Sequence, residues 1–330
     1  MELLSPTNML VFSPRGIYCP AADIYIDPSS PVKRAIITHA HSDHARGGHA
    51  HYLAHRHSVP ILRHRLGPGI SAQGIEYGDS IEHNGVRISL HPAGHIIGSA
   101  QVRLEYQGEI WVVSGDYKLE NDGISQPFEP LHCTVFVTES TFALPVYRWQ
   151  EQQEVYNEIN AWWTENQRRG NVSVLLCYAL GKAQRVLAHL DRSIGPIYAH
   201  ETIETATSVL RKNGVSLPEL VRIPGNVAHA EVQKGIVLAP PSLTGSPWLR
   251  RLHPYSLGYA SGWMIAQGAR QRPGINKGFV LSDHADWAGL NAAVKATGAH
   301  RILVMHGYAV PFARWLRENG YDAAEANGQS

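Results

Sequence analysis

The stretch HAHSDH, residues 39–44, places three imidazoles and one carboxylate within six positions, directly after an apolar run that reads as a short strand. Nitrogen and carboxylate ligands suit zinc and the neighbouring first-row metals. His39 and His41 are two positions apart, so an extended backbone or a tight turn can direct both side chains to one ion. Asp43 and His44 follow on the next turn and can face a second ion. The segment therefore predicts a site for two metals.

The composition is that of a globular protein with a sizeable core. The chain has 330 residues, of which 44% are hydrophobic and 17% charged, and this length gives room for two domains. The formal net charge is only +1, so a nucleic acid would have to be bound by a local basic patch or by metals.

Three features of the chain predict its compartment. The three cysteines form no CxxC pair, and an odd number does not build a disulfide framework. The first residues lack the basic and apolar regions of a signal peptide, and no run approaches a membrane-spanning length. We therefore expect a cytoplasmic protein without a membrane partner.

Polar residues follow the ends of several apolar runs outside the opening stretch. The runs at residues 24–26, 86–90, 110–113 and 134–137 lead to Asp27, His95, Asp116 and Glu139. Near the other end of the chain, the runs at 278–281 and 301–304 lead to His284 and His306. Loops at strand ends commonly build a site on a rigid sheet. The pattern predicts that these side chains gather at one place.

The character of the sequence changes near residue 150. A helical pattern at 150–167 is followed by alternating strand and helix candidates, which predict a parallel α/β unit. A basic stretch rich in proline and glycine, residues 268–278, leads back out, and the last fifty residues resume the earlier pattern. We expect a discontinuous first domain, 1–149 and 277–330, with an inserted domain at 150–276.

The set formed by Asp27, the HAHSDH stretch, His95 and Asp116 resembles the four motifs of the metallo-β-lactamase superfamily, in order and at suitable spacing. Glu139, the Ser-Asp-His triplet that ends at His284, and His306 resemble three further motifs of its β-CASP branch, whose members are nucleic-acid-processing nucleases. The resemblance covers essentially the whole chain. It implies an α/β fold: an αββα metallo-β-lactamase sandwich carrying an inserted α/β β-CASP domain.

The resemblance also implies a role for each motif residue. One Zn²⁺ or Mn²⁺ ion would take His39, His41 and His95, and a second ion would take Asp43, His44 and His306. Asp116 would bridge the two ions, and Asp43 would belong to the catalytic set. Asp27 would accept a hydrogen bond from a ligand histidine and fix its tautomer. The residues concerned are Asp27, His39, His41, Asp43, His44, His95, Asp116 and His306.

Two residues are candidates for protonating the leaving group. An imidazole titrates near neutral pH, so His284 is the candidate general acid. Glu139 would hydrogen-bond to His284, orient it and raise its pKa. Asp286, just after His284, reads as the N-terminal residue of a helix.

The predicted substrate contacts lie mainly in the inserted region. Lys182 begins a predicted helix after a glycine and could meet a phosphate together with backbone N–H groups. Ser261 and Gly262 form a small turn that could approach a phosphate closely. Arg250 and Arg270 could contribute to a local basic patch.

The phrases at residues 178–184, 260–264 and 282–287 are most similar to one bacterial subgroup, the ligase-associated DNA exonucleases. They predict a DNA exonuclease that acts on single strands or DNA ends in repair, in functional association with an ATP-dependent DNA ligase and a helicase. The alternative is an RNA-processing endo- or exoribonuclease, since RNA-acting branches tend to carry His at the position of His306. A small-molecule hydrolase would need neither the inserted domain nor the Glu139 and His284 pair. A binding module with a degenerate site would lack ligands that this chain has.

Overall fold

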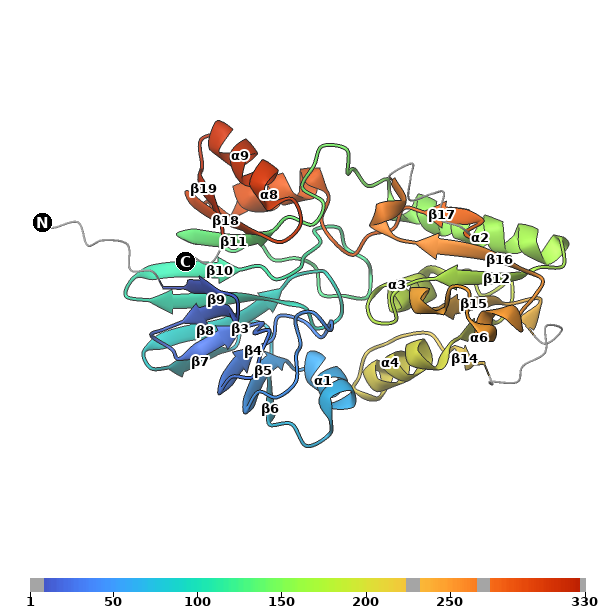
Figure 1. Cartoon of the computed structure of the whole chain (residues 1–330), viewed down its shortest axis with the longest axis horizontal. Coiled ribbons are helices and arrows are strands. Elements are labelled where there is room, and N and C mark those ends of the chain that lie inside the picture. Colours follow the sequence, from blue (N-terminus) through green and yellow to red (C-terminus); the bar gives the residue numbers. More distant parts are fainter. Residues whose placement is uncertain (1–8, 224–231, 266–273, 327–330) are drawn as a thin grey trace, which may run out of the picture. The chain divides into compact units, whose positions relative to one another are not determined.

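The computed structural model describes residues 9–223, 232–265 and 274–326, and these form two compact units (Figure 1). The first unit comprises Met1–Asn121, Ser125–Val146 and His284–Ser330, and the second comprises Asp122–Ile124 and Tyr147–Asp283. The chain thus returns to the first unit at His284, later than the predicted residue 277. The reason is that the strand β17 (Lys277–Phe279) pairs with the sheet of the second unit.

The first unit holds two sheets, and the first of them has six strands in chain order. The early strands are antiparallel, and from the third strand onward the pairs are parallel. The strands are β1 (Val11–Ser13), β2 (Gly16–Cys19), β3 (Ile24–Ile26), β4 (Arg34–Ile36), β5 (His51–His55) and β6 (Ala72–Ile75).

The second sheet of this unit has seven strands in the order β19-β18-β11-β10-β9-β8-β7. It combines an antiparallel meander with parallel strands contributed by the C-terminal part of the chain. The strands are β7 (Ser80–His83), β8 (Val86–Pro92), β9 (Ala100–Tyr106), β10 (Glu109–Val113), β11 (Val135–Glu139), β18 (Arg301–Met305) and β19 (Asp322–Glu325).

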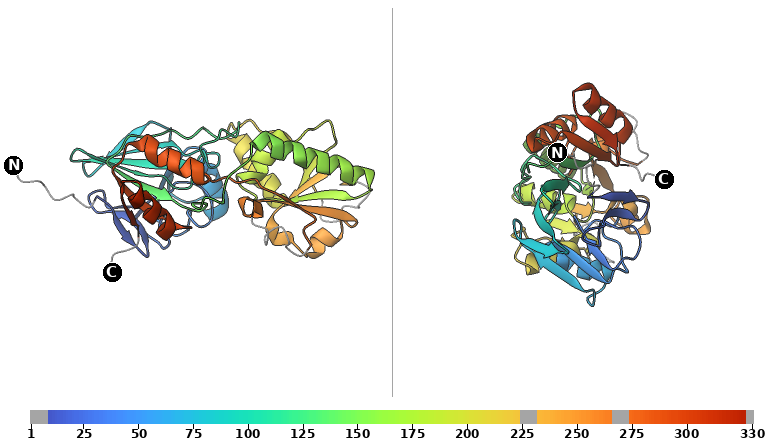
Figure 2. Two further views of the ribbon diagram at one scale, coloured as in Figure 1. Left: turned by 90° about the horizontal axis from the view of Figure 1, so that it is seen from above. Right: turned by 90° about the vertical axis from the view of Figure 1, so that its left-hand side faces the viewer.

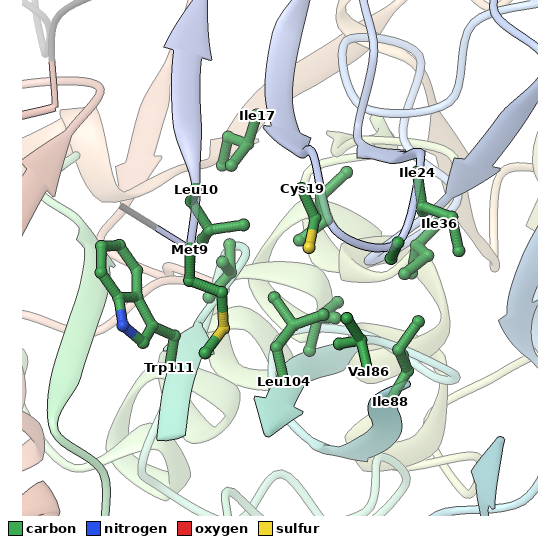
Figure 3. Packing of buried hydrophobic residues seen from close by; sticks show 14 of the residues in the cluster. Met9, Leu10, Ile17, Cys19, Ile24, Ile36, Val86, Ile88, Leu104 and Trp111 are labelled. Atoms are coloured by element: carbon green, nitrogen blue, oxygen red, sulfur yellow. The ribbon is translucent and has the colours of Figure 1, made fainter. Parts of the chain in front are cut away.

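The inner faces of the two sheets bury one hydrophobic core (Figure 3). Ile24 and Ile36 come from the first sheet, and Ile88, Leu104 and Trp111 come from the second. Each is at most 5% exposed. This burial of apolar area is the main force that holds the two sheets together.

Helices cover the outer faces of the same two sheets. The helix α1 (Ser58–Leu66) packs on β5 and β6. The helices α8 (Trp287–Thr297) and α9 (Ala309–Glu318) bury Leu290 and Phe312 against Phe136 and Ile302 of the second sheet. The first unit is therefore layered helix, sheet, sheet, helix. Asp286 is the N-cap of α8, as predicted, and its side chain accepts a hydrogen bond from the Gly289 N–H.

The second unit is built on one parallel sheet of six strands in the order β14-β13-β15-β12-β16-β17. Its central strands are buried along their whole length, as expected where helices cover both faces. Besides β17 the strands are β12 (Val172–Leu176), β13 (Ile197–Ala199), β14 (Val221–Arg222), β15 (Ile236–Ala239) and β16 (Tyr255–Ala260).

One face of this sheet packs against helices α2 and α3, and α2 lies along the sheet (Figure 2). Trp163 of α2 is fully buried there, as its helical spacing predicts. The other face packs against α6 and η2. The helices are α2 (Gln152–Arg168), α3 (Lys182–His189), α4 (Glu201–Lys212), η1 (Pro241–Leu243), α6 (Pro247–Arg250) and η2 (Gly262–Ile265).

The α/β class predicted from the sequence is confirmed by this architecture. Within the described ranges, no helix has both the length and the apolar character needed to cross a membrane.

Candidate active site

Strand direction brings the candidate residues of the second sheet of the first unit together. The strands β10, β11 and β18 are parallel, and β8 runs the same way because β9 is antiparallel to both β8 and β10. Their carboxyl ends therefore lie at one edge of the sheet. His95, Asp116, Glu139 and His306 lie at or just beyond those ends.

Two glycines allow the loops at this edge to turn sharply. Gly94 and Gly115 both have a positive φ, +73° and +57°. A Cβ on Gly94 would lie 2.1 Å from the Lys118 carbonyl oxygen, and one on Gly115 would lie 2.8 Å from the Cβ of Thr38. Because a side chain fits at neither position, these glycines hold the backbone that presents His95 and Asp116.

Four ligand atoms converge where this edge meets the loop after β4. His41 Nδ1 lies 3.1 Å from His39 Nε2 and 3.2 Å from His95 Nε2. Asp116 Oδ2 lies 3.6 Å from the Nε2 atoms of both His39 and His95. A tetrahedral ion with bonds of about 2.0–2.1 Å has ligand atoms roughly 3.3–3.4 Å apart. The four atoms therefore have the spacing of a tetrahedral donor set.

The protonation of this cluster also suits a cation. Burial, together with the neighbouring histidines His44, His41, His95 and His284, lowers the pKa of His39 well below its usual value, so its ring is neutral. Nitrogen lone pairs that face one another at these distances cannot all be paired by hydrogen bonds among themselves. A divalent cation would satisfy them together with the Asp116 carboxylate, so the residues fit a zinc- or manganese-type metal.

The second predicted ion is supported by fewer contacts. His44 Nε2 lies 3.5 Å from Asp116 Oδ1 and 3.9 Å from Asp43 Oδ2, and the His44 and His306 rings are 5.7 Å apart. Asp116 thus turns one oxygen to His39 and His95 and the other to His44, as a bridging carboxylate would. The set of Asp43, His44 and His306 is not as tightly convergent as the first, and a second ion there stays a prediction.

His44 differs from His39 in its charge. Burial lowers the pKa of His44, but the carboxylates of Asp116 and Asp27 outweigh this effect and raise it to about 10. The ring is therefore protonated at neutral pH in the metal-free protein. Metal binding at this nitrogen would have to displace a proton.

Asp27 lies behind these ligands. Its Oδ2 accepts a hydrogen bond from His44 Nδ1 at 2.7 Å and one from Thr38 Oγ1 at 2.5 Å, and its Oδ1 accepts from the Thr38 N–H at 2.8 Å. The bond to Nδ1 leaves Nε2 of His44 directed at Asp116. This is the arrangement by which a carboxylate fixes the tautomer of a ligand histidine.

A partly exposed histidine, His284, is hydrogen-bonded to the buried Glu139 beside the donor set. His284 Nδ1 lies 3.0 Å from both carboxylate oxygens of Glu139, and His284 Nε2 lies 4.0 Å from Asp116 Oδ2. Glu139 also accepts hydrogen bonds from the Tyr117 N–H and from Thr141 Oγ1. With Nδ1 held by Glu139, the imidazole presents Nε2 to the donor set.

Glu139 is ionised although it is only 1% exposed. Burial alone would raise its pKa, but the charge and hydrogen bond of His284, together with the bonds from Thr141 and Tyr117, lower it. The negative charge of the Glu139 carboxylate beside Nδ1 of His284 favours the protonated form of the imidazole. A histidine in this state can supply a proton from Nε2.

The predicted substrate residues lie in the second unit and differ in their exposure. Lys182 is 3% exposed and its Nζ is 2.5 Å from Asp283 Oδ2, an environment that does not present the ammonium to a ligand. Ser261 and Gly262 are buried as well. Arg250 is exposed and donates to the Gly245 carbonyl, whereas Arg270 lies outside the described residues.

Several groups in and near the site were not predicted. The hydroxyl of Thr38 donates to Asp27 and that of Thr141 donates to Glu139, and no sequence pattern predicts either contact. The partners of Lys182 were also missed. In the second unit, Arg185 Nη1 lies 3.1 Å from Asp283 Oδ1, and its Nη2 lies 3.0 Å from Asp122 Oδ2.

Comparisons with known proteins find relatives that align with this chain over only part of their own length. No family model matches the chain. A protein of Opitutus terrae named as a probable DNA ligase is 32% identical over 311 residues, which is 93% of this chain and 30% of that protein. The cleavage and polyadenylation specificity factor subunit 3 of Dictyostelium discoideum is 26% identical over 146 residues, 42% of this chain and 18% of that protein. The chain therefore spans less than a third of the length of these relatives.

Two further comparisons concern an RNA-cutting enzyme and the fold. The endoribonuclease YSH1 of Saccharomyces cerevisiae is 29% identical over 121 residues, 36% of this chain and 15% of that protein. A solved protein of unknown function from Enterococcus faecalis superposes with a TM-score of 0.59 at 12% identity, covering 83% of this chain and 75% of the other. At that identity the match shows a shared fold alone.

Proposed function

We propose that this chain is a metal-dependent nuclease of the β-CASP family, a family that its similarity to the polyadenylation factor subunit and the endoribonuclease supports. The single observation that carries the proposal is the convergence of His39, His41, His95 and Asp116 on one point, with Nε2 of His284 facing the same carboxylate. Nitrogen and carboxylate donors beside a positioned acid suit the hydrolysis of a phosphodiester.

The protein's own residues divide the work. Divalent ions held by the predicted ligands would polarise the phosphodiester and lower the pKa of a bound water towards neutral pH. His284 would hold a proton at Nε2 and give it to the leaving oxygen, while Glu139 keeps Nδ1 hydrogen-bonded and the ring in place. Asp27 would keep His44 in the tautomer that a ligand needs.

We propose DNA as the substrate and an exonuclease acting on single strands or DNA ends, in repair. Support comes from the relative named as a DNA ligase, which aligns with 93% of this chain, whereas the endoribonuclease aligns with 36%. The sequence segments similar to those of ligase-associated DNA exonucleases point the same way, and they imply a functional association with a ligase and a helicase in the cytoplasm. The alternative, RNA processing, is favoured by His306 and by the name of the endoribonuclease.

The test compares matched single-stranded DNA and RNA oligonucleotides, labelled at either end, with added Mn²⁺ or Zn²⁺. The expected result is stepwise shortening of the DNA while the RNA stays intact. The polarity follows from which of the two end labels is released from the DNA first. Preferential cleavage of RNA would move the protein to the alternative. His41→Ala is the control: it should abolish cleavage and lower the metal content, because it removes a nitrogen at the centre of the donor set.

A further inference from the structure

Thr38 lies between β4 and the first histidine of the HAHSDH stretch, and it is 1% exposed. Its backbone is fixed on both sides, since its N–H donates to Asp27 Oδ1 and its carbonyl accepts from the Ala100 N–H, each at 2.8 Å. Its hydroxyl lies 2.5 Å from Asp27 Oδ2 and 3.2 Å from His39 Nδ1. The side chain therefore connects the partly buried carboxylate of Asp27 with a ring of the donor set.

The donor and the acceptor of each hydrogen bond between His39, Thr38 and Asp27 follow from the chemistry of the three groups. A carboxylate can only accept, so the Thr38 hydroxyl donates its one proton to Asp27. The Thr38 oxygen then has only lone pairs to offer, and His39 Nδ1 must be the donor in the contact between them. With its proton on Nδ1, His39 is unprotonated at Nε2, the atom that lies 3.1 Å from His41 Nδ1 and 3.6 Å from Asp116 Oδ2.

Thr38 also touches the loop that carries Asp116. A Cβ added to Gly115 would lie 2.8 Å from the Thr38 Cβ, so the threonine side chain packs directly on the backbone at Gly115. One buried residue thus contacts three elements of the site: Asp27, His39 and the turn before Asp116. Asp27 itself bonds directly to His44 Nδ1.

We infer that Thr38 is a positioning residue through which Asp27 sets the tautomer of His39. In this arrangement one carboxylate orients a histidine ligand of each predicted ion, His44 directly and His39 through the threonine hydroxyl. The inference rests on the proposed function, because it takes His39 as a metal ligand.

Thr38→Val tests the hydroxyl while keeping the branched shape that packs on Gly115. Without the hydroxyl, His39 Nδ1 loses its acceptor, and the ring can place its proton on Nε2 instead. Loss of such an outer hydrogen bond typically lowers metal affinity about 10–100-fold. We expect a loss of that size in Thr38→Val, and near-normal affinity in Thr38→Ser, which restores the hydroxyl.

The experiment titrates metal-free wild type, Thr38→Val and Thr38→Ser with Co²⁺, recording the visible absorption bands and the dissociation constant. Thr297→Val is the matched control, since Thr297 is a buried threonine of the same unit whose hydroxyl donates to the Val294 carbonyl, accepts from the Ala299 N–H and lies beside the Cys133 thiol. Weaker binding and altered bands in Thr38→Val alone support the inference. Wild-type affinity and bands in Thr38→Val would overturn it.

A second measurement needs no substitution. Nitrogen-15 NMR of the histidine rings in wild-type protein reports which ring nitrogen of His39 carries the proton. The inference requires the proton of His39 to be on Nδ1. An Nε2–H tautomer would overturn the inference even if Thr38→Val failed to fold. Failure of the wild type to bind Co²⁺ at all would instead count against the proposed function, and the inference about Thr38 would then lose its basis.

Discussion

Histidines with the same intrinsic chemistry are set apart in this chain by the groups that face each ring nitrogen. His39 is neutral because it is buried among other imidazoles, whereas His44 is protonated because the carboxylates of Asp116, Asp27 and Asp43 outweigh its burial. His284 has a carboxylate on one nitrogen and the donor set beyond the other. Under the proposed function, His39 and His44 would hold metal, the latter after losing a proton, and His284 would donate a proton.

The role of His284 can be separated from metal binding. His284→Gln should lower the turnover number of oligonucleotide cleavage about 10²–10⁴-fold, the usual contribution of a general acid, while the metal content stays at the wild-type level. Glu139→Gln should also slow turnover, because a neutral partner stabilises the protonated imidazole less. The measurement pairs single-turnover kinetics with metal analysis of the same samples. Loss of metal in His284→Gln would contradict the assignment and make His284 a ligand.

At this scale the sequence was informative only where chemistry is local. The spacing within residues 39–44 predicted convergent ligands, and His39 and His41 do converge with His95. The environment of Lys182 could not be predicted in this way. Its burial depends on Asp283, about a hundred residues further along the chain, and no pattern near Lys182 reveals that contact.

At the scale of elements, strand direction explains why distant residues meet. Each of β8, β10, β11 and β18 ends at a candidate residue, and all four run the same way in one sheet. The apolar runs predicted these strands and their polar ends. They could not predict the pairing order, because strand order depends on long-range packing that short patterns do not encode.

The strand β5 carries a pH-sensitive contribution to stability. Burial, helped by the charges of His57 and Arg56, lowers the pKa of His55 to about 3, against about 6.5 in an unfolded chain. Below pH 6.5 the His55 side chain therefore binds a proton in the unfolded state but not in the folded state. The contribution of neutral His55 to the free energy of unfolding is complete above pH 6.5 and declines as the pH falls towards 3. Between pH 7 and pH 5 the loss amounts to about 2 kcal/mol of unfolding free energy.

Urea denaturation at the two pH values checks this expectation. His55→Phe keeps the ring stacked on Tyr77 but cannot titrate, so its stability should fall by about 2 kcal/mol less than that of the wild type over this range. His51→Gln, an exposed position on the same strand, should keep the wild-type decline. Equal declines in His55→Phe and the wild type would rule out His55 as the source.

The helix α3 gives a prediction about buried charge. Lys182 and Arg185 of this helix neutralise Asp283 and Asp122, and all four side chains are buried. Removing one partner from such a group typically costs about 3–5 kcal/mol, because the remaining charges stay buried with less compensation. Lys182→Met should therefore destabilise the protein by that amount.

Lys295→Met is the matched control, an exposed lysine whose loss should change the stability by less than about 0.5 kcal/mol. Thermal unfolding and oligonucleotide binding are measured for both variants. A stable Lys182→Met protein that binds oligonucleotides more weakly would favour the phosphate contact predicted from the sequence over the structural role seen here.

At the scale of the whole molecule, all the candidate metal ligands belong to one unit. The change of character near residue 150 and the return of strand-end histidines predict an insertion, and the compact units of the structure divide after Val146 and after Asp283. The end of the insertion was harder to place, because β17 and the residues after it are as apolar as the strands that follow. Only its pairing with β16 shows to which sheet β17 belongs.

Because the ligands lie in one unit, metal should stabilise the two units unequally. A ligand present at about 1,000 times its dissociation constant adds about 4 kcal/mol to the stability of the state that binds it. Hydrogen exchange followed by mass spectrometry, with and without a chelator, should show slower exchange in β8, β10 and β11 when metal is bound. The amides of β12 and β15, whose unit holds none of the ligands, should change little. Equal protection of β10 and β12 by metal would mean that the two units unfold together. Unchanged exchange in β10 and β11 would argue against a metal at Asp116.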